Sequence, residues 1–447
     1  MEKNITKDMT KGSPWRCILE FAVPSFLGLL FYQFYGMVDS VIVGKCLGVQ
    51  ALAAVGSTGS INYMICGFCM GVCNGFVIPV AQKFGAGDDR ALRKFVANSA
   101  WLSVIFSLVT TTLVCSLCRQ ILLWMKTPDN IFHDAYSYIF VIFLGIPIIF
   151  VGNVSGGIIR SFGDSKTPLY FTIISSFLNI VLDLVSILVL HMTVVGPALA
   201  TVISQGFSSA LNLLYIRKKC DLLRMEREEW KPDGAYMKIL CSMGIPMGLQ
   251  HSITAVGSVV IQTSVNTFGA ASIAAVTAAN RVNMLVCTPF DALATTMSTY
   301  SGQNMGAKKV DRIHAGVRVS LILGSVYAAA SFLILSVWGR DITRLFVSAS
   351  ETEILDKAHQ FLVINSLFFI LLLVVNVLRL SIQGMGFTGV AMFAGVCEMA
   401  ARILAAFVMV PLFGYTAVCF ANPLAWICAD LFLILTYVRI TRNLYRI

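Results

Sequence analysis

Two aspartates lie inside apolar segments that are long enough to cross a membrane, and their carboxyl groups could handle ions. Asp39 lies within Phe21–Val43, and Asp183 lies within Leu169–Leu190. A charged side chain at membrane depth costs at least ~2.5 kcal/mol on insertion scales, so such a group usually faces a water-filled cavity. Each aspartate could instead be a structural residue that pairs with a polar neighbour. The positions of both residues along their segments are therefore needed to decide between an ion-handling and a structural role.

The composition is typical of a helical membrane protein. Hydrophobic residues make up 57% of the 447 residues and charged residues only 13%, whereas a soluble domain carries about 25% charged residues. A helix needs about 20 apolar residues to cross the hydrocarbon core, and no segment alternates with the period of a barrel strand. The stretches that are long enough are 15–43, 51–80, 91–118, 134–159, 168–190, 194–216, 236–267, 271–302, 311–338, 357–384, 389–410 and 415–438. We therefore expect an all-α membrane protein with twelve transmembrane helices.

Lys and Arg fall mostly on one side of these expected helices. With the N-terminus inside, the inner segments hold 24 of these residues and the outer segments hold 6. Cytoplasmic segments carry the excess of positive charge, so both termini are expected in the cytoplasm, with no removable signal peptide. The net charge of +10 is explained by this bias and by contact with anionic membrane lipids. The sequence contains no basic stripe interleaved with aromatic residues, so nucleic acid is not expected as a partner.

The chain consists of two similar halves on either side of its longest polar stretch. The segments that match at a steady offset of 221 to 223 residues are Pro24 and Pro246, Leu52–Gly56 and Ala274–Ala278, Ala81–Ala86 and Gly302–Ala307, and Ser161–Gly163 and Gly384–Gly386. We expect an N-terminal lobe over residues 1–216, a cytoplasmic linker over 217–235 and a C-terminal lobe over 236–447. Six helices per half insert in the same direction, which indicates a transporter repeat of the parallel kind.

The two aspartates are expected at a similar depth in the N-terminal lobe, together with two uncharged polar residues. At a rise of 1.5 Å per residue, Asp39 lies about 6 Å below the outer end of its helix, and Asp183 and Thr201 lie about 10 Å below theirs. Asn179 is one turn deeper than Asp183 on the same helix face. Protonation of this cluster would remove charge and let the lobe repack. The four residues are therefore our candidate ion-coupling site.

Substrate contacts are expected from aromatic and amide side chains within the spans. Aromatic faces attract organic cations, although such side chains also pack helices together or face lipid. The candidates are Tyr32, Gln33, Tyr35 and Asn153.

The C-terminal lobe carries charges at depth as well. Glu398 and Arg402 are four residues apart and opposite in charge, so they share one helix face. The pair either neutralises itself or acts as a second ion-responsive switch. Arg379 lies near the end of its helix and is expected to snorkel towards the membrane surface. Asp291 and Asp430 are also at depth, and the sequence identifies no partner for either.

Enzymatic motifs and metal-binding patterns are missing from the sequence. No zinc-binding His-Glu motif, nucleophile elbow or phosphate loop occurs, so we expect neither an enzyme nor a cofactor. Cys66, Cys69 and Cys73 share one helix face, but no His or carboxylate neighbours them. Helix packing is therefore favoured over a metal site for these cysteines.

The chain resembles the multidrug and toxic compound extrusion (MATE) family over nearly its whole length. The resemblance rests on the order and spacing of Pro24, Asp39, Asn153–Pro168, Asn179–Asp183, Gly196–Gln205, Arg281, Pro289 and Gln303–Ala307. It implies a V-shaped protein of two pseudo-symmetric six-helix lobes in the inner (cytoplasmic) membrane of a bacterium. It also implies export of organic cations and amphipathic drugs against inflow of H⁺ or Na⁺, and we expect a monomer.

Within this family, the resemblance favours a drug/H⁺ antiporter that works by alternating access. In the proton-coupled branch, the positions that match the four candidate ion-coupling residues form a network. The sodium-coupled branch is expected to use acids on spans seven and ten, where this chain has only Asp356 at an outer mouth. Na⁺ could still bind at Asp39, Asn179 and Asp183. A flippase for lipid-linked oligosaccharides is a further alternative, but it should show a strongly cationic central cavity.

Overall fold

The computed structural model describes residues 7–445, and every regular element in that range is a helix. Ten of these helices are long and apolar enough to cross a membrane. Two further pairs of helices meet the same criteria together, and each pair is bent, by 44° and by 52°, at a short break. If each bent pair is one span, the described residues contain twelve spans, which confirms the expected all-α membrane fold.

The chain divides into two compact units. Unit 1 contains Leu27–Gly248 with the chain up to Asp8, and unit 2 contains Met9–Phe26 and Leu249–Ile447. Two long helices are each shared between the units, namely α1 (Pro14–Cys46) and α9 (Gly234–Asn266). The first part of α1 therefore packs within unit 2, and the first part of α9 packs within unit 1, so the division does not fall at a single linker.

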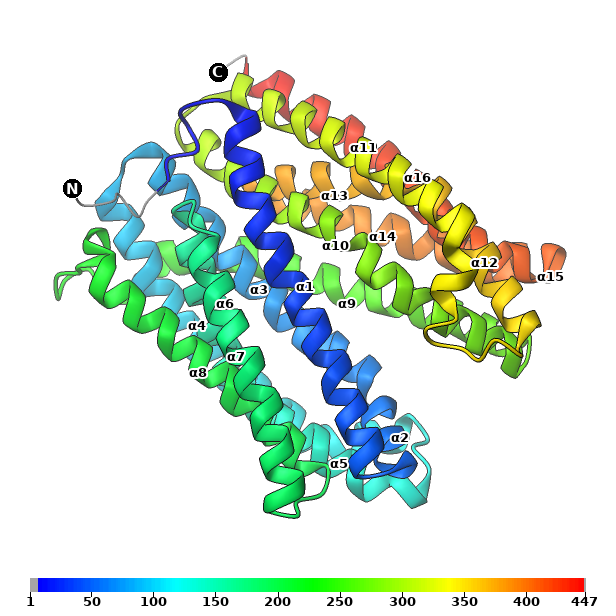
Figure 1. The fold of residues 1–447 in the computed structure, drawn as a ribbon. Coiled ribbons are helices and arrows are strands. Elements are labelled where there is room, and N and C mark those ends of the chain that lie inside the picture. Colours follow the sequence, from blue (N-terminus) through cyan, green and yellow to red (C-terminus); the bar gives the residue numbers. More distant parts are fainter. Residues whose placement is uncertain (1–6, 446–447) are drawn as a thin grey trace. The chain divides into compact units, whose positions relative to one another are not determined.

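The remaining elements of unit 1 follow α1 in chain order. They are α2 (Val49–Ser57), α3 (Gly59–Ala86), α4 (Asp89–Trp124), α5 (Asp129–Leu144), α6 (Ile146–Ser161), α7 (Lys166–Leu184), the π-helix η1 (Val185–Val189), α8 (Val195–Lys219) and the 3₁₀ turn η2 (Asp221–Leu223). Helices α6, α7 and α8 pack against one another, and α3 and α4 pack against α6 (Figure 1). The break between α5 and α6 falls at Gly145, just before a proline in the first turn of α6.

Unit 2 repeats this order after α9. Its elements are α10 (Ala270–Gly306), α11 (Val310–Thr343), α12 (Thr352–Leu367), α13 (Phe369–Gly384), α14 (Thr388–Leu404), the π-helix η3 (Ala405–Met409), α15 (Val410–Phe413) and α16 (Tyr415–Leu444). Helix α10 packs on α13, and α14 packs on α16 (Figure 1). The core of this unit is built from aliphatic and aromatic side chains of α10 to α14 and α16.

The internal repeat extends to the backbone conformation of the turns. Eight residues with positive φ form pairs at offsets of 221 to 223, namely Gly48 and Gly269, Gly87 and Lys308, Gly163 and Gly386, and His191 and Gly414. Glycine adopts this left-handed region without a steric penalty, whereas Lys308 and His191 hold it as ordinary residues. The two π-helices also occupy corresponding places. The repeat expected from the sequence is therefore confirmed by the local geometry of both units.

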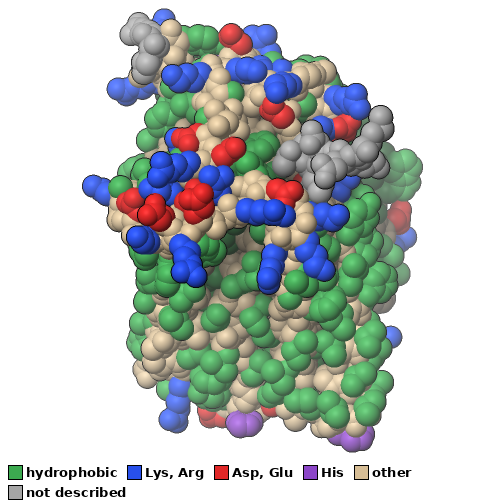
Figure 2. Space-filling model, turned by 90° about the vertical axis from the view of Figure 1, so that its left-hand side faces the viewer, with side chains coloured by type: hydrophobic (Ala, Val, Ile, Leu, Met, Phe, Trp, Pro, Cys, Tyr) green, Lys and Arg blue, Asp and Glu red, His purple; other side chains and the backbone are tan. Residues whose placement is uncertain are grey.

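The linker after α8 lies against α4 within unit 1. The guanidinium of Arg93 donates to the carboxylate of Glu229 at 2.9 Å, and the indole of Trp101 donates to the carbonyl of Trp230 at 2.9 Å. On the face drawn in Figure 2, Lys and Arg side chains gather above a broad hydrophobic surface. Such a surface is suited to contact with lipid tails below and lipid head groups above.

Helices α3 and α9 approach closely through small residues. A Cβ placed on Gly71 would lie 2.5 Å from the carbonyl oxygen of Met247, and one on Gly75 would meet the backbone of Gly244. Each helix contributes two glycines four residues apart, Gly71 and Gly75 on α3 and Gly244 and Gly248 on α9. This small-xxx-small pattern lets helix backbones come together in a membrane, where lipid tails provide no hydrophobic driving force between helices.

Replacement of Gly75 by Ala is expected to lower the thermal stability of the protein, because the new methyl group meets backbone that can move only with its helix. Overpacking of this kind costs about 1–3 kcal/mol. Gly59→Ala is the matched control, since it lies on the same helix and a Cβ there meets nothing within 4 Å. Thermal unfolding of the detergent-purified variants measures the effect, and equal midpoints would contradict the close helix contact.

Candidate functional site

The four candidate ion-coupling residues lie together in unit 1. The carboxyl groups of Asp39, on α1, and Asp183, at the end of α7, are direct neighbours. Asn179 lies one turn before Asp183, and its amide donates to the hydroxyl of Thr201 on α8 at 3.5 Å. Asn179 and Asp183 have no exposed surface, and Asp39 is 9% exposed. The structure therefore brings these four residues, from three helices, to one place within unit 1.

These acids have no cation beside them among residues 7–445. The two carboxyl groups are neighbours of each other, and neither forms an ion pair with a described Lys, Arg or His. Both oxygens of Asp183, one oxygen of Asp39 and the side-chain oxygen of Asn179 are buried without a hydrogen-bond donor. Buried carboxylates are normally paired. This cluster therefore presents four unsatisfied oxygen atoms to whatever cation can reach it.

The backbone around Asp183 departs from a regular α-helix. Helix α7 passes directly into the π-helix η1 one residue after Leu184, and π-helical turns occur frequently at functional sites. Ser186 in this turn donates to the carbonyl of Asp183 at 2.9 Å. A Cβ on Gly196, at the start of α8, would lie 2.7 Å from the Ser186 hydroxyl. The absence of a side chain at Gly196 therefore allows α8 to close on the irregular turn.

A cavity of about 350 Å³ adjoins the acidic cluster. Of the residues expected to contact ions or substrate, Tyr32, Tyr35, Asp39, Asn153, Asn179 and Thr201 line it. Gln33 and Asp183 do not line it: Gln33 is half-buried elsewhere on α1, and Asp183 lies behind the wall. The rings of Tyr32 and Tyr35 meet edge to face, with centroids 5.1 Å apart. The cavity has the size and the mixed aromatic and polar lining of a small-molecule site.

Sequence reasoning missed several residues of this cavity, including Tyr138, Arg160, Gln205 and Asn212. They belong to polar stripes that run along otherwise apolar helices. On α8 the stripe is Thr201, Gln205, Ser208, Ser209 and Asn212, and on α7 it is Thr172, Ser175, Ser176 and Asn179. Spacings of three and four residues place each stripe on one helix face. That periodicity of polar residues is the signal that could have found the cavity wall.

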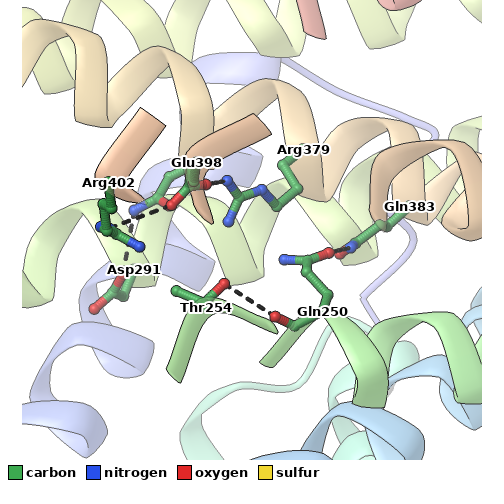
Figure 3. A network of polar contacts seen from close by, with 8 residues as sticks. Gln250, Thr254, Asp291, Arg379, Gln383, Glu398 and Arg402 are labelled. Carbon is green, nitrogen blue, oxygen red and sulfur yellow. Dashed lines mark hydrogen bonds and ion pairs between the residues drawn. The ribbon is translucent and has the colours of Figure 1, made fainter. Parts of the chain in front are cut away.

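Unit 2 holds a buried ionic cluster of a different kind (Figure 3). Glu398 on α14 lies between two guanidinium groups, forming an ion pair with Arg379 on α13 and another with Arg402 at 3.5 Å. At most 9% of any of the three side chains is exposed. Nearby, the amide of Gln383 donates to Gln250 at 2.6 Å. Glu398 is therefore matched by cations of the protein itself.

The expectation that Arg379 snorkels is wrong. Its side chain is buried because a carboxylate on the neighbouring helix, Glu398, binds it inside unit 2. Asp430 on α16 also lies near Arg379, although no donor contacts its two buried oxygens. Asp291 on α10 accepts a hydrogen bond from Asn376 at 3.2 Å. The sequence places these residues within long apolar helices, but it does not show which helix faces them.

The family of the chain can be assigned from comparison with known proteins. The MatE family model matches residues 24–185 and again residues 246–408. The two matches cover most of the chain and repeat at the offset seen in the turns. The chain belongs to the MatE family of efflux transporters, which confirms the resemblance to the multidrug and toxic compound extrusion family.

Curated relatives and solved structures agree with this assignment. The probable multidrug resistance protein YoeA of Bacillus subtilis is 28% identical over 371 residues, which cover 81% of this chain and 80% of the relative. The multidrug export protein MepA of Staphylococcus haemolyticus is 24% identical and covers 96% of this chain and 94% of its own length. A multidrug resistance MATE family transporter solved in an outward-facing conformation has the same fold, with a TM-score of 0.92 at 22% identity over 99% of both chains.

Glu398→Gln is expected to destabilise the protein strongly, because it leaves two buried guanidinium groups without the carboxylate between them. Breaking a buried ionic cluster in this way costs about 3–5 kcal/mol. The matched control is Glu353→Gln, which removes an exposed i,i+4 partner of Lys357 and should cost no more than about 1 kcal/mol. Thermal unfolding of both purified variants checks this, and similar losses for the two would contradict the role assigned to Glu398.

Proposed function

We propose that this protein exports organic cations and other amphipathic compounds in exchange for inward H⁺, by alternating access. The acidic pair in unit 1 carries this proposal, because Asp39 and Asp183 are adjacent, buried and without a cation of the protein. Two ionised carboxyl groups in such a place carry a desolvation cost of several kcal/mol each. A mobile cation that enters the cluster removes that cost, and its departure restores it.

A proton is the simplest cation for this arrangement. One proton shared between two adjacent carboxyl groups removes one charge and forms one hydrogen bond, and it needs no further ligands. Na⁺ would have to replace its hydration shell with the oxygens of Asp39, Asn179, Asp183 and Thr201. These oxygens make Na⁺ coupling at the same cluster the second candidate, and the experiment below compares the two ions.

The cavity supports substrates with aromatic or cationic parts. Tyr32, Tyr35 and Tyr138 supply aromatic faces, and Met70 supplies an adaptable apolar contact. Asn179 and Thr201 belong both to the cavity wall and to the acidic cluster. The cation and the substrate therefore act on common residues, which supports their exchange.

We place the transporter in the inner membrane of a bacterium, as a multi-pass monomer with both termini in the cytoplasm. The excess of Lys and Arg in alternate segments supports this orientation. The docked linker supports it as well, because exposed cations and the Trp101 and Trp230 side chains lie together where a membrane surface would begin.

Asp39→Asn is expected to abolish transport while leaving the protein folded, because the amide keeps the shape of the side chain but cannot gain or lose the coupling proton. The purified protein is reconstituted in liposomes with a fluorescent organic cation as cargo. Transport is measured first with a pH gradient and then with a sodium gradient, and the variant should lose at least about tenfold of the pH-driven rate. An unchanged melting profile is the control for folding.

The two gradients separate the two proposed ions. Transport driven by the pH gradient alone supports the proton, and transport driven only by sodium replaces H⁺ with Na⁺ at the same site. Full pH-driven transport by Asp39→Asn would disprove the coupling role of the acidic pair.

A further inference from the structure

Arg160 is a cation inside the cavity that the coupling mechanism does not use. It lies in the last turn of α6 and lines the same cavity as Asp39. Among the residues that the structure describes along this wall, Arg160 is the only Lys or Arg, and Asp39 is the only acid. No described residue forms an ion pair or hydrogen bond with its guanidinium. The positive charge of Arg160 therefore has no counter-charge among the described residues of the cavity wall.

The carboxylate nearest to Arg160 in the chain is already engaged. Asp164 caps the start of α7, where its side chain accepts hydrogen bonds from the backbone amides of Lys166 and Thr167, both at 3.0 Å. Its second oxygen accepts from the hydroxyls of Thr167 at 2.6 Å and Tyr215 at 3.1 Å. Asp164 therefore belongs to the helix start and leaves Arg160 without a counter-charge.

A second donor points to the same place as the guanidinium. A Cβ built on Gly156 would lie 3.5 Å from Nη1 of Arg160 and 3.5 Å from Nδ2 of Asn212 on α8. Asn212 also lines the cavity; its Oδ1 is buried without a hydrogen-bond donor, and its Nδ2 is the atom that lies beside the position above Gly156. Because Gly156 has no side chain, a space lined by one guanidinium and one amide donor stays open above it.

The basic and acidic ends of the cavity are far apart. Asn212 lies eleven residues after Thr201 on α8, which corresponds to about 16 Å at 1.5 Å per residue. We propose that Arg160 and Asn212 bind an anionic group, a carboxylate or a phosphate, of the exported compound. The cavity would then favour amphipathic compounds that carry such a group in addition to an aromatic body. This inference about the anionic group rests on the proposed export function.

The chemistry of the donors supports this ligand class. A guanidinium binds carboxylate and phosphate through two parallel hydrogen bonds, and such charge-assisted bonds are about twice as strong as neutral ones. Tyr35 and Tyr138 lie in the same cavity and would contact the body of the compound. An anionic group at Arg160 would supply the counter-charge that the protein leaves out.

The test compares two dyes with the same aromatic body, one with a free carboxylate and one with that carboxylate blocked as a methyl ester. A xanthene dye with a free carboxylate and its methyl ester are titrated against the full-length transporter in phosphatidylcholine nanodiscs at fixed pH. The wild type should prefer the carboxylate dye, and Arg160→Gln should reduce the ratio of the two affinities by about tenfold or more. Arg160→Lys, which keeps the charge but loses the paired hydrogen bonds, should give an intermediate ratio.

A second substitution tests the site without touching the charge. Gly156→Ala places a methyl group between the two donors at ordinary contact distance, so it should reduce the ratio while the protein still folds. Gly206→Ala is its matched control, because a Cβ there also meets only ordinary contacts, at 3.6 Å from Ile148, and Gly206 does not line the cavity. Its affinity ratio should equal that of the wild type.

The outcomes separate this inference from the proposed function. Equal binding of the two dyes by the wild type, or an equal loss for both dyes in Arg160→Gln, would overturn the anion site. Arg160-dependent binding of phosphatidylglycerol or inorganic phosphate without discrimination between the dyes would also overturn it, because the anion would then not belong to the exported compound. Binding at fixed pH requires no gradient, so a failure of proton coupling in Asp39→Asn leaves this test intact.

Discussion

The balance of charge inside an apolar helical unit is the constraint on which the rest of this structure depends. No bulk water is present at membrane depth to solvate an ion, so each buried charge needs a partner nearby. Unit 2 meets this requirement for Glu398, which lies between Arg379 and Arg402, whereas the two buried oxygens of Asp430 have no donor. Unit 1 places Asp39 beside Asp183 and supplies no cation. The repeated fold thus holds an acid that is paired with two cations in unit 2 and an acidic pair without a cation in unit 1.

The internal repeat makes this contrast informative. Four pairs of left-handed turn residues and two π-helices show that the backbone was kept in both units. The side chains at corresponding depths diverged: at the offset of 223 residues, Asn179 corresponds to Arg402, and Arg160 corresponds to Gln383. Gln383 is satisfied by Gln250, whereas Arg160 faces a cavity without a partner. Among the described residues, unit 1 therefore holds both an acidic pair without a cation and a guanidinium without an acid.

The sequence indicates how far along a span each residue lies, but it indicates poorly which neighbouring helix that residue faces. Apolar length places the spans, and counting 1.5 Å per residue from their ends brings Asp39, Asp183 and Thr201 to one level. Which face of a helix meets its neighbour depends on packing and on breaks such as the 44° bend between α5 and α6. For that reason Tyr138 and Arg160, which lie on opposite sides of this bend, were not assigned to the cavity. Arg379 was misjudged for the same reason, because its partner Glu398 lies on another helix.

In the proposed mechanism, the link between ion and substrate rests on residues that border both the acidic pair and the cavity. Asn179 and Thr201 are bound to each other, border the acidic pair and line the cavity. A change of charge at Asp183 acts directly on Asn179 one turn away, and the π-helical turn that follows Asp183 offers a backbone that is less regular than the rest of α7. Helix α8 carries Thr201 at one end of the cavity and Asn212 at the other. A shift of this one helix in response to the cation would therefore alter both ends of the substrate cavity together, so coupling requires no contact between the ion and the exported compound.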